Sequence, residues 1–333
     1  MLSIIIINFK SADLILECLA SIKAETHKIA YEIIIVDNSN DQAGEMRVKA
    51  AFPEIQWLDM GYNAGFARGN NKGIRQAKGD AVLLLNPDTI ILEEALDKAY
   101  PLFMESGAAA CGVQLLNEDR TPQIAGNFAM RGGLNYLLPL PFLGNFLKWL
   151  GNLLKVSRPS IEEVKDIEEV DWINGAFLMV RRDILPKAGL LDEDFFLYAE
   201  EAEWCYRLKK TGRMLIYGNL HILHLQGETA NEAFGSEGKG YYNLYDKKGR
   251  QLIISNFLRI RKQFGVGWFL FDTLMYTLGI PVFAIGLMLS NIFKLKWPFK
   301  GFKAVWGFVL NVGSLWVYAP KIISGRPHFY KLL

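Results

Sequence analysis

Carboxylate and imidazole side chains stand at several points where the chain passes from one predicted element to the next. Asp88 lies near the end of the stretch LLLNPDT at residues 83–89, in which an apolar run stops at Asn86 and Pro87. A carboxylate just past the end of an interior strand lies where open α/β sheets bind ligands, so Asp88 is a candidate ligand-site residue. Asp88 could equally be a cap for the helical pattern that follows.

Two further groups could complete such a site. Asp37 follows an earlier apolar run in VDNSN and could accept hydrogen bonds from a ribose or a base, although the same residues are ordinary turn formers. His221 and His224, two of only four histidines, lie on or just after a predicted strand in HILHLQGET. An imidazole there could bind a divalent ion together with Asp88, or could serve only as a structural hydrogen-bonding group.

An acidic cluster occurs in DEDFFLYAEEAEWCYR at residues 192–207. Glu200, Glu201 and Glu203 suit the positive end of a helix dipole, and Glu203 can pair with Arg207, four residues further on. A general base for a hydroxyl acceptor must be a carboxylate or imidazole in a partly dry pocket. The aromatic residues that precede the cluster could raise the pKa of a carboxylate there, so the cluster is a candidate for this role.

Glycines recur every four residues in GYNAGFARGNNKG, from residue 61 to residue 73. Gly65, Gly69 and Gly73 would share one helix face and could turn a helix N-terminus towards a diphosphate, but close packing of a helix on a sheet would use the same glycines. Neither G-x-G-x-x-G after the first strand nor G-x-x-x-x-G-K-[ST] occurs, which argues against dehydrogenases and P-loop kinases.

The elements that must position these residues alternate between strand and helix. Apolar runs predict strands at 2–7, 32–36, 55–58 and 81–85, and helical patterns lie at 11–24, 41–51 and 66–78. Such alternation predicts right-handed βαβ units and an α/β fold with a mostly parallel central sheet. The runs WINGAFLMV and MLIYGN, with an acidic helix ending at Gly212 between them, predict that the sheet continues into a second half.

The C-terminal part has a different composition. Residues 259–333 carry ten Lys or Arg and one acid, which leaves a net charge of −7 for the first 258 residues and +9 for this tail. A charge-free run at 273–293 is long enough to cross a bilayer, and a weaker apolar stretch follows at 304–319. Flanking lysines and aromatic residues are typical of a membrane interface, whereas two helices closing the core, or a nucleic-acid-binding tail, fit this pattern less well.

Three further features concern the compartment and the middle of the chain. The apolar segment 134–156, broken by prolines and glycines, could be a lipid-facing segment or lid, or a helix packed on the body. Three widely spaced cysteines argue against a zinc site or a disulfide framework. The N-terminus lacks a basic region and a cleavage site, so we expect the body to stay in the cytoplasm.

Taken in order, the motifs INFK, VDNSN, GYNAGFARGNNKGI, LLLNPDT, WINGAFLMVRRD, LLDEDFFLYAEEAEWCYRLKKTG and HLQGET closely resemble family 2 glycosyltransferases, in particular rhamnosyltransferases of bacterial surface polysaccharide synthesis. The resemblance covers roughly residues 1–260. It implies a GT-A fold, a nucleotide-diphosphate sugar donor, Mg²⁺ or Mn²⁺ as cofactor, and inversion at the anomeric carbon. A lapsed, membrane-bound scaffold and, less well supported, a sugar-phosphate nucleotidyltransferase are the alternatives.

The resemblance also implies roles for individual residues. Asp88 would bind the metal with His224, because the first acid of the D-x-D position is Asn86 here, and Asp37 would contact the nucleotide. Glu201 would be the catalytic base, although relatives carry Asp at this position. The remaining positions are Asn8, Asn63, Gly65 and Arg68 on the donor side and Trp172, Asn174, Gly175 and Glu200 on the sugar and acceptor side.

These inferences combine into one expected organisation. We predict a glycosyltransferase domain over residues 1–258, with a nucleotide-sugar half at 1–115 and an acceptor half at 116–258, followed by membrane-associated helices at 259–333. The apolar tail favours a lipid-linked glycan as acceptor. We expect attachment to the cytoplasmic face of the inner membrane, either peripheral or through a C-terminal anchor, and no binding of nucleic acid.

Overall fold

The computed structural model describes residues 1–128, 133–156, 160–161, 163–225, 236 and 243–332. The chain packs into two compact units. Unit 1 consists of Met1–Ala129, Pro159–Phe196 and Glu200–Thr229, and unit 2 consists of Met130–Arg158, Leu197–Ala199 and Ala230–Leu333. Packing thus groups residues 130–158 and 197–199 with the C-terminal helices, whereas the boundaries predicted from sequence lie after residues 115 and 258.

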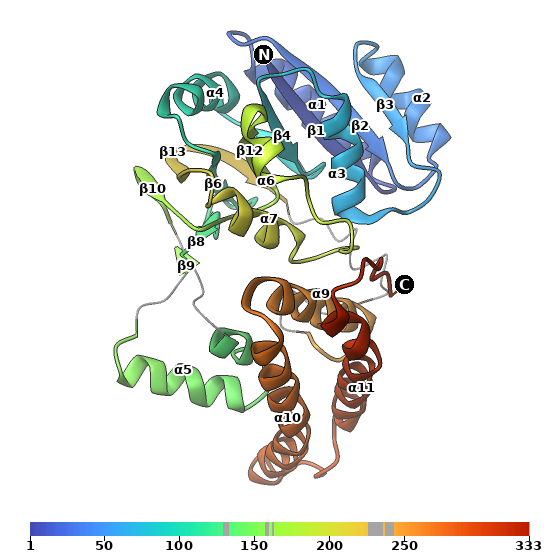
Figure 1. Ribbon diagram of the computed structural model, residues 1–333, viewed down its shortest axis with the longest axis vertical. Helices are drawn as coiled ribbons and strands as arrows, with labels where there is room; N and C mark the ends of the chain where they lie inside the picture. Colours follow the sequence, from blue (N-terminus) through green and yellow to red (C-terminus); the bar gives the residue numbers. More distant parts are fainter. Residues whose placement is uncertain (129–132, 157–159, 162, 226–235, 237–242, 333) are drawn as a thin grey trace. The chain divides into compact units, whose positions relative to one another are not determined.

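Unit 1 is built on a sheet in which the described strands follow the order β10-β13-β6-β12-β4-β1-β2-β3 (Figure 1). Two short strands, β5 and β7, pair with β13 and β6 at the side of this path. The bounds are β1 (Leu2–Asn8), β2 (Tyr31–Asp37), β3 (Gln56–Asp59), β4 (Ala81–Leu85), β5 (Thr89–Ile91), β6 (Ala110–Leu116), β7 (Pro122–Gln123), β10 (Ile167–Glu169), β12 (Phe177–Arg181) and β13 (Met214–His224). A smaller sheet joins β11 (Trp172–Ile173), β8 (Gly126–Asn127) and β9 (Ser160–Ile161).

The predicted parallel arrangement is confirmed for β3, β2, β1 and β4, which pair in parallel along their lengths. The later strands make the sheet mixed, since β12 runs antiparallel to both β4 and β6, while β13 is parallel to β6. The helices of unit 1 are α1 (Ala12–Glu25), α2 (Gln42–Ala51), α3 (Gly65–Gln76), α4 (Ala95–Ser106), α6 (Leu185–Ala188) and α7 (Glu200–Leu208), with a 3₁₀ turn η2 (Arg182–Ile184).

The central strands are continuous apolar runs because the sheet buries them on both faces. All five residues of β4 are buried, and β1 is buried except at Ile7. The glycines of α3 permit a close approach to this sheet: a Cβ at Gly73 would lie 2.6 Å from Ile5 Cγ2, and one at Gly69 would lie 3.0 Å from Ile7 Cδ1. Helix-on-sheet packing therefore accounts for these two glycines.

The apolar group at 172–180 forms two strands instead of one. β11 belongs to the small sheet and β12 to the large one, and residues 174–176 turn between them. Asn174 makes this turn, because its Oδ1 accepts a hydrogen bond from the Ala176 N–H at 2.9 Å. The acidic helix also ends earlier than Gly212, at Leu208.

Unit 2 is helical in its described residues. It contains η1 (Gly133–Leu137), α5 (Leu143–Leu153), α9 (Lys247–Phe264), α10 (Val266–Phe293) and α11 (Phe302–Ser324). Aromatic rings of α10 and α11 pack at its centre, where Phe283 and Tyr276 contact Phe308. Among the described helices, α10 is the one long and apolar enough to cross a membrane by length and composition.

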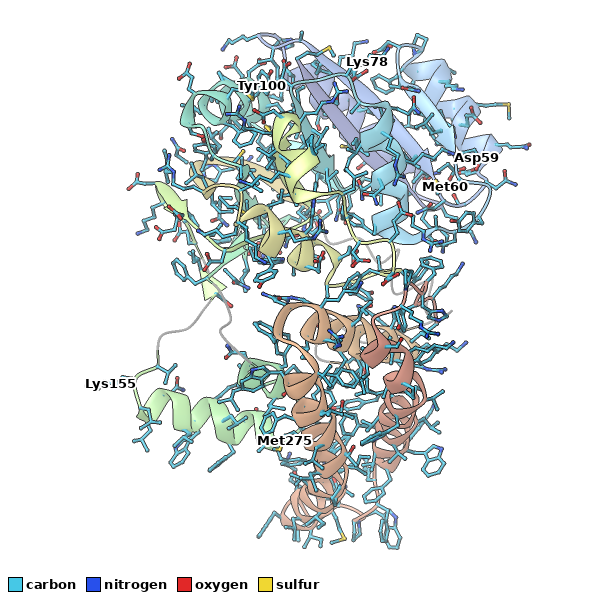
Figure 2. All side chains as sticks on the ribbon, in the orientation of Figure 1. Asp59, Met60, Lys78, Tyr100, Lys155 and Met275 are labelled. Atoms are coloured by element: carbon cyan, nitrogen blue, oxygen red, sulfur yellow. The ribbon has the colours of Figure 1, made fainter. Side chains whose placement is uncertain are left out.

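Many apolar side chains of unit 2 are exposed, in contrast to the buried core of the sheet. On α5, Phe146 is 54% exposed and Trp149 59%. A stripe on α10 recurs every three to four residues, as on one face of a helix, and consists of Leu270, Leu274, Leu278, Val282, Ile285, Leu289 and Ile292. Figure 2 draws the side chains, with Lys155 just beyond α5 and Met275 on α10. α5 is therefore a helix with an exposed apolar surface.

Candidate active site

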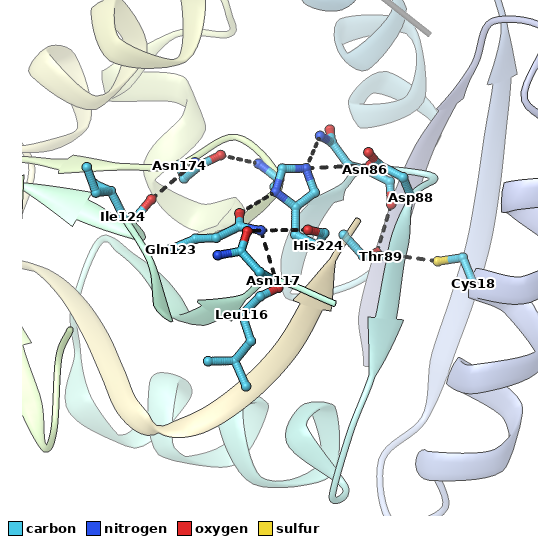
Figure 3. Close-up of polar contacts among 11 residues, drawn as sticks. Cys18, Asn86, Asp88, Thr89, Leu116, Asn117, Gln123, Ile124, Asn174 and His224 are labelled. Carbon is cyan, nitrogen blue, oxygen red and sulfur yellow. Dashed lines mark hydrogen bonds and ion pairs between the residues drawn. The ribbon is translucent and has the colours of Figure 1, made fainter. Parts of the chain in front are cut away.

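The carboxyl ends of β4 and β13 bring Asp88 and His224 together (Figure 3). β13 pairs antiparallel with the short strand β5, in a register that sets His224 opposite Thr89. Asp88 precedes Thr89, and its carbonyl accepts a hydrogen bond from the Leu225 N–H at 2.9 Å. As a result, His224 Nε2 lies 3.6 Å from Asp88 Oδ1 and 3.3 Å from Asn86 Nδ2. Three residues chosen from sequence thus share one site.

The electrostatics of this pair suit a ligand role for the histidine. Burial lowers the pKa of His224, while the Asp88 carboxylate opposes this shift. Since burial is the larger effect, the imidazole is neutral at neutral pH and Nε2 or Nδ1 can act as a ligand atom. A carboxylate beside a neutral imidazole is a donor pair that Mn²⁺ or Mg²⁺ can use when a substrate supplies further oxygen ligands.

The Asp88 and His224 pair does not form a closed metal cage. Among the described residues, no three His, Cys, Asp or Glu side chains gather to hold a metal ion. His221, the other histidine considered from sequence, is on β13 three residues before His224. A cation at this site would therefore need oxygen atoms from a bound ligand or from water, as is usual for Mg²⁺ with a phosphate ligand.

Asp37 and Asn8 lie together at the ends of β2 and β1, but both organise the local backbone. Asp37 Oδ1 accepts hydrogen bonds from Asn8 Nδ2 at 3.0 Å and from the N–H and hydroxyl of Ser39 at 2.9 and 2.7 Å. Its Oδ2 accepts the Asp41 N–H at 2.7 Å. Turn formation, the alternative from sequence, is thus observed, and a nucleotide contact for Asp37 and Asn8 stays a prediction.

The loop before α3 and the first turn of this helix contain the other donor-side residues. Asn63 Oδ1 accepts the Gly65 N–H at 3.2 Å, and Asn38 Nδ2 donates to the Gly65 carbonyl at 2.9 Å. Arg68 Nε donates to the Glu193 carbonyl at 3.1 Å, and its Nη1 is 3.4 Å from the hydroxyl of Tyr62. The loop is fixed by these bonds, and Gly65 has a φ of 73°, in the left-handed region.

Replacing Gly65 by alanine is expected to lower the free energy of unfolding by about 3 kcal/mol, measured by chemical denaturation. A Cβ at Gly65 would overlap the backbone carbonyl of Phe196, and the left-handed φ adds about 1–2 kcal/mol of strain. Gly61 is the matched control, because its φ is 74° but no atom lies within 4 Å of a Cβ there. If Gly61→Ala and Gly65→Ala lowered the free energy of unfolding equally, the close approach to Phe196 would contribute nothing to the loss.

The turn at residues 174–176 connects the Asp88 site with the predicted base. The Asn86 N–H donates to the Ala176 carbonyl at 3.0 Å. Next to it, a Cβ on Gly175 would lie 3.4 Å from Glu201 Cγ, so the stem of Glu201 packs against this glycine. The structure thus brings Asn86, Gly175 and Glu201 into one neighbourhood. Asn86, two residues before Asp88, and Glu201 thus contact the same turn.

Trp172 and Asn174 shape the same region from β11 and the turn. Asn174 Nδ2 donates to the Ile124 carbonyl at 3.3 Å, and its N–H donates to the Ala125 carbonyl at 2.9 Å. Trp172 pairs with Asn127 across the small sheet, and its indole N–H is buried without a hydrogen-bond partner in the described part of the chain. These contacts show structural roles, and contact with a sugar or acceptor stays a prediction for both residues.

The helix that carries Glu200 and Glu201 begins after a strained turn. Tyr198 and Ala199 have φ of 73° and 67°, a region that costs a non-glycine residue about 1–2 kcal/mol. Leu197 comes just before this turn, and within unit 2 its carbonyl accepts a hydrogen bond from Ser255 Oγ at 2.7 Å. Glu200 is 3% exposed and Glu201 is half-buried. Strain of this kind is often found at functional sites, where the surrounding structure maintains it.

One residue of this site was not foreseen from sequence. Gln123, on the two-residue strand β7, contacts the ring of His224 through its side chain, with Oε1 3.0 Å from Nδ1. A glutamine beside proline in a short polar stretch carries no motif, and its position depends on the pairing of β7 with β6. No feature of the sequence signals this contact.

Comparison with known proteins agrees with the family that the motifs resemble. Residues 3–152 match the family model described as Glycosyl transferase family 2. The low-salt glycan biosynthesis hexosyltransferase Agl10 of Haloferax volcanii is 30% identical over 213 residues, 63% of this chain and 62% of that protein. An N-acetylglucosaminyl-diphospho-decaprenol L-rhamnosyltransferase of Mycobacterium tuberculosis is 25% identical over 227 residues, 62% of this chain and 70% of that protein.

A solved structure shows the same fold over most of the chain. The mannosyltransferase PcManGT from Pyrobaculum calidifontis, solved with GDP-Man and Mn²⁺, covers 96% of this chain and 87% of its own, with a TM-score of 0.50 and 13% identity. The mixed α/β sheet is therefore that of the GT-A glycosyltransferases. Residues 3–152 are thus similar to the family 2 glycosyltransferases, and the chain resembles a hexosyltransferase and a rhamnosyltransferase over nearly two thirds of its length.

Proposed function

We propose that the protein transfers a sugar, with rhamnose as one candidate, from a nucleotide-diphosphate donor to a hydroxyl of a lipid-linked glycan, with inversion at the anomeric carbon. The approach of Asp88 to His224 at the ends of two strands is the observation that carries this proposal. Similar proteins support it, since the Mycobacterium tuberculosis relative is a rhamnosyltransferase named for a diphospho-decaprenol acceptor. PcManGT was solved with a sugar nucleotide and Mn²⁺.

In this mechanism Asp88 and His224 would hold a divalent cation, which when bound neutralises the charge that develops on the leaving diphosphate. Glu201, whose stem packs on Gly175, accepts the proton of the acceptor hydroxyl. The acceptor oxygen forms a bond to the anomeric carbon on the face opposite the diphosphate, and the bond from that carbon to the diphosphate oxygen breaks. One displacement of this kind inverts the anomeric configuration.

A screen of purified full-length protein against a panel of sugar nucleotides tests the function. We expect binding of one nucleotide sugar and slow hydrolysis of it, both requiring Mn²⁺ or Mg²⁺. Adding a lipid-linked glycan should convert hydrolysis into transfer. Binding without any hydrolysis or transfer would favour the catalytically lapsed scaffold, for which Glu201 and Asn86 are the departures from the family pattern. Formation of a sugar nucleotide from a triphosphate would favour a nucleotidyltransferase.

Unit 2 would hold the enzyme at the membrane where such acceptors reside, on the cytoplasmic face in this proposal. The exposed apolar stripe on α10 contains no charged residue. In the most apolar part of this helix 22% is buried, which is low for a core helix. Five lysines lie between α10 and α11 or in the end turns of α11, and all are exposed, as needed for contact with anionic headgroups: Lys294, Lys296, Lys300, Lys303 and Lys321.

Replacing Phe146 and Trp149 together by glutamate is expected to weaken vesicle binding of the full chain at least about tenfold. Each exposed ring on α5 would contribute apolar contact with lipid of about 1–2 kcal/mol. Flotation with vesicles that contain anionic lipid measures the bound fraction. Met46→Glu is the matched control, because Met46 is 69% exposed on α2 of unit 1. Equal binding by the α5 variant, the control and the unmodified chain would remove α5 from the membrane contact.

A further inference from the structure

The side chain of Gln123 has a fixed orientation beside His224, set by acceptor atoms on three sides of its nitrogen. Gln123 Nε2 lies 2.6 Å from the His224 carbonyl, 2.8 Å from Asn117 Oδ1 and 3.3 Å from the Leu116 carbonyl (Figure 3). Carbonyl oxygens cannot donate, so the amide nitrogen must face them. The amide oxygen, Oε1, therefore faces the ring, 3.0 Å from Nδ1 of His224.

A chain of hydrogen bonds that begins at Asp119 requires the same orientation of the Gln123 amide. Asp119 Oδ1 accepts the Thr121 hydroxyl at 2.5 Å, so the oxygen of Thr121 is left to accept a hydrogen bond from Asn117 Nδ2 at 2.8 Å. This directs Asn117 Oδ1 towards Gln123 Nε2. The direction of donation therefore runs from His224 through Gln123, Asn117 and Thr121 to a carboxylate. Each side chain has a single consistent assignment.

The consequence for His224 concerns which ring nitrogen carries hydrogen. Because Gln123 Oε1 accepts, Nδ1 must be the protonated nitrogen. In the neutral ring Nε2 then carries no hydrogen, and its lone pair accepts from Asn86 Nδ2 at 3.3 Å and lies 3.6 Å from Asp88 Oδ1. The main chain of His224 is bound to the same side chain, because Gln123 Nε2 donates a hydrogen bond to the His224 carbonyl.

Resting on the proposed function, we propose that Gln123 is a positioning residue that fixes His224 in the Nδ1–H tautomer and so presents an unprotonated Nε2 to the divalent cation of the donor site. Residues that hydrogen-bond a ligating histidine in this way typically change metal affinity about 10- to 100-fold when removed. Gln123 itself touches neither cation nor substrate in this scheme, and its effect passes through the imidazole.

The tautomer can be observed directly by long-range ¹H–¹⁵N correlation spectra of the full-length, metal-free protein. The chain has four histidines, so the His224 signals are identified by their loss in a His224→Gln variant. We expect the Nδ1–H pattern in the unmodified protein. In Gln123→Leu we expect the Nε2–H pattern to appear. An Nε2–H pattern in the unmodified protein would overturn the proposal without any substitution.

Mn²⁺ affinity in the presence of a nucleoside diphosphate, measured by the electron paramagnetic resonance of free Mn²⁺, gives the second readout. We expect Gln123→Leu to bind Mn²⁺ about 10- to 100-fold more weakly than the unmodified protein. Asn117→Ala is the matched control: it removes one partner of Gln123 Nε2, but two main-chain carbonyls still orient the amide. It should change Mn²⁺ affinity less than about twofold.

The two proposals fail in different ways. If the unmodified protein binds no Mn²⁺ together with any nucleoside diphosphate, the metal-dependent function is contradicted. If the unmodified protein binds Mn²⁺ and Gln123→Leu binds it equally well, only the role of Gln123 is overturned. Should Gln123→Leu fail to fold, Gln123→Met, which keeps the length of the side chain but lacks an oxygen acceptor, separates the same outcomes.

Discussion

Asp88→Asn is expected to lower sugar transfer about 1000-fold at saturating Mn²⁺, which corresponds to about 4 kcal/mol of transition-state stabilisation. The substitution keeps the shape of the side chain and the backbone pairing of β5 with β13, in which Asp88 takes part through its carbonyl. It removes the negative charge that faces His224 Nε2 at 3.6 Å and that would bind the cation. Initial rates with the donor identified in the screen measure the effect.

Asp97→Asn is the matched control for Asp88→Asn. Asp97 is also a buried carboxylate in unit 1, but its oxygens accept the N–H groups of His27, Lys28 and Ile29 at 2.7–3.1 Å. Its loss should cost stability by about 1–3 kcal/mol and leave the rate per folded molecule close to normal. Turnover near that of the unmodified enzyme in Asp88→Asn would instead rule out Asp88 as the metal-binding residue.

The sheet could be predicted from sequence because its central strands are read as uninterrupted apolar runs. β4 begins and ends where the run AVLLL does, and β1 and β2 extend one or two residues beyond the runs that predicted them. Strands covered on both faces bury every side chain, so no alternation obscures the signal. The helices were equally readable, since the glycines of α3 recur on the face that meets β1 and β2.

The site was only partly predictable, because its geometry depends on pairings that no local pattern encodes. Asp88 and His224 were found as strand-end residues, but their approach to 3.6 Å needs β13 to run antiparallel to the three-residue strand β5. Gln123 comes to the ring through an equally short strand. A pairing of two or three residues leaves no periodicity in the sequence to detect.

For Asp37 the sequence identified the motif but did not show that its carboxylate binds the neighbouring backbone. A carboxylate after the second strand is typical of nucleotide sites. In the folded chain the same oxygens already accept hydrogen bonds from Asn8, Ser39 and Asp41. The sequence could not decide between a nucleotide contact and turn formation for Asp37. The number of backbone N–H groups that reach a side chain in a turn depends on the conformation of the turn.

Glu201→Gln is expected to lower transfer about 100- to 10,000-fold, the range for loss of a general base, while donor and Mn²⁺ affinities stay within about twofold. Glutamine keeps the stem that packs on Gly175, so position is retained and proton acceptance is lost. Transfer to the lipid-linked acceptor and Mn²⁺ binding are measured on the same preparation. Glu203→Gln is the control, because Glu203 is committed to Arg207 at 2.7–3.1 Å and should affect stability alone.

Glu201→Asp then tests how the site has adapted to the longer acid. Shortening the side chain withdraws the carboxylate by about 1 Å, and a displacement of that size can cost about 100-fold in rate. If the turn at Gly175 is fitted to glutamate, Glu201→Asp should fall between the unmodified enzyme and Glu201→Gln. If Glu201→Asp were faster than the unmodified enzyme, the site would keep the geometry of its relatives, and glutamate would lower the rate. Full activity in Glu201→Gln would move the base elsewhere, with Glu200, Asp192 and Asp194 as the carboxylates to test next.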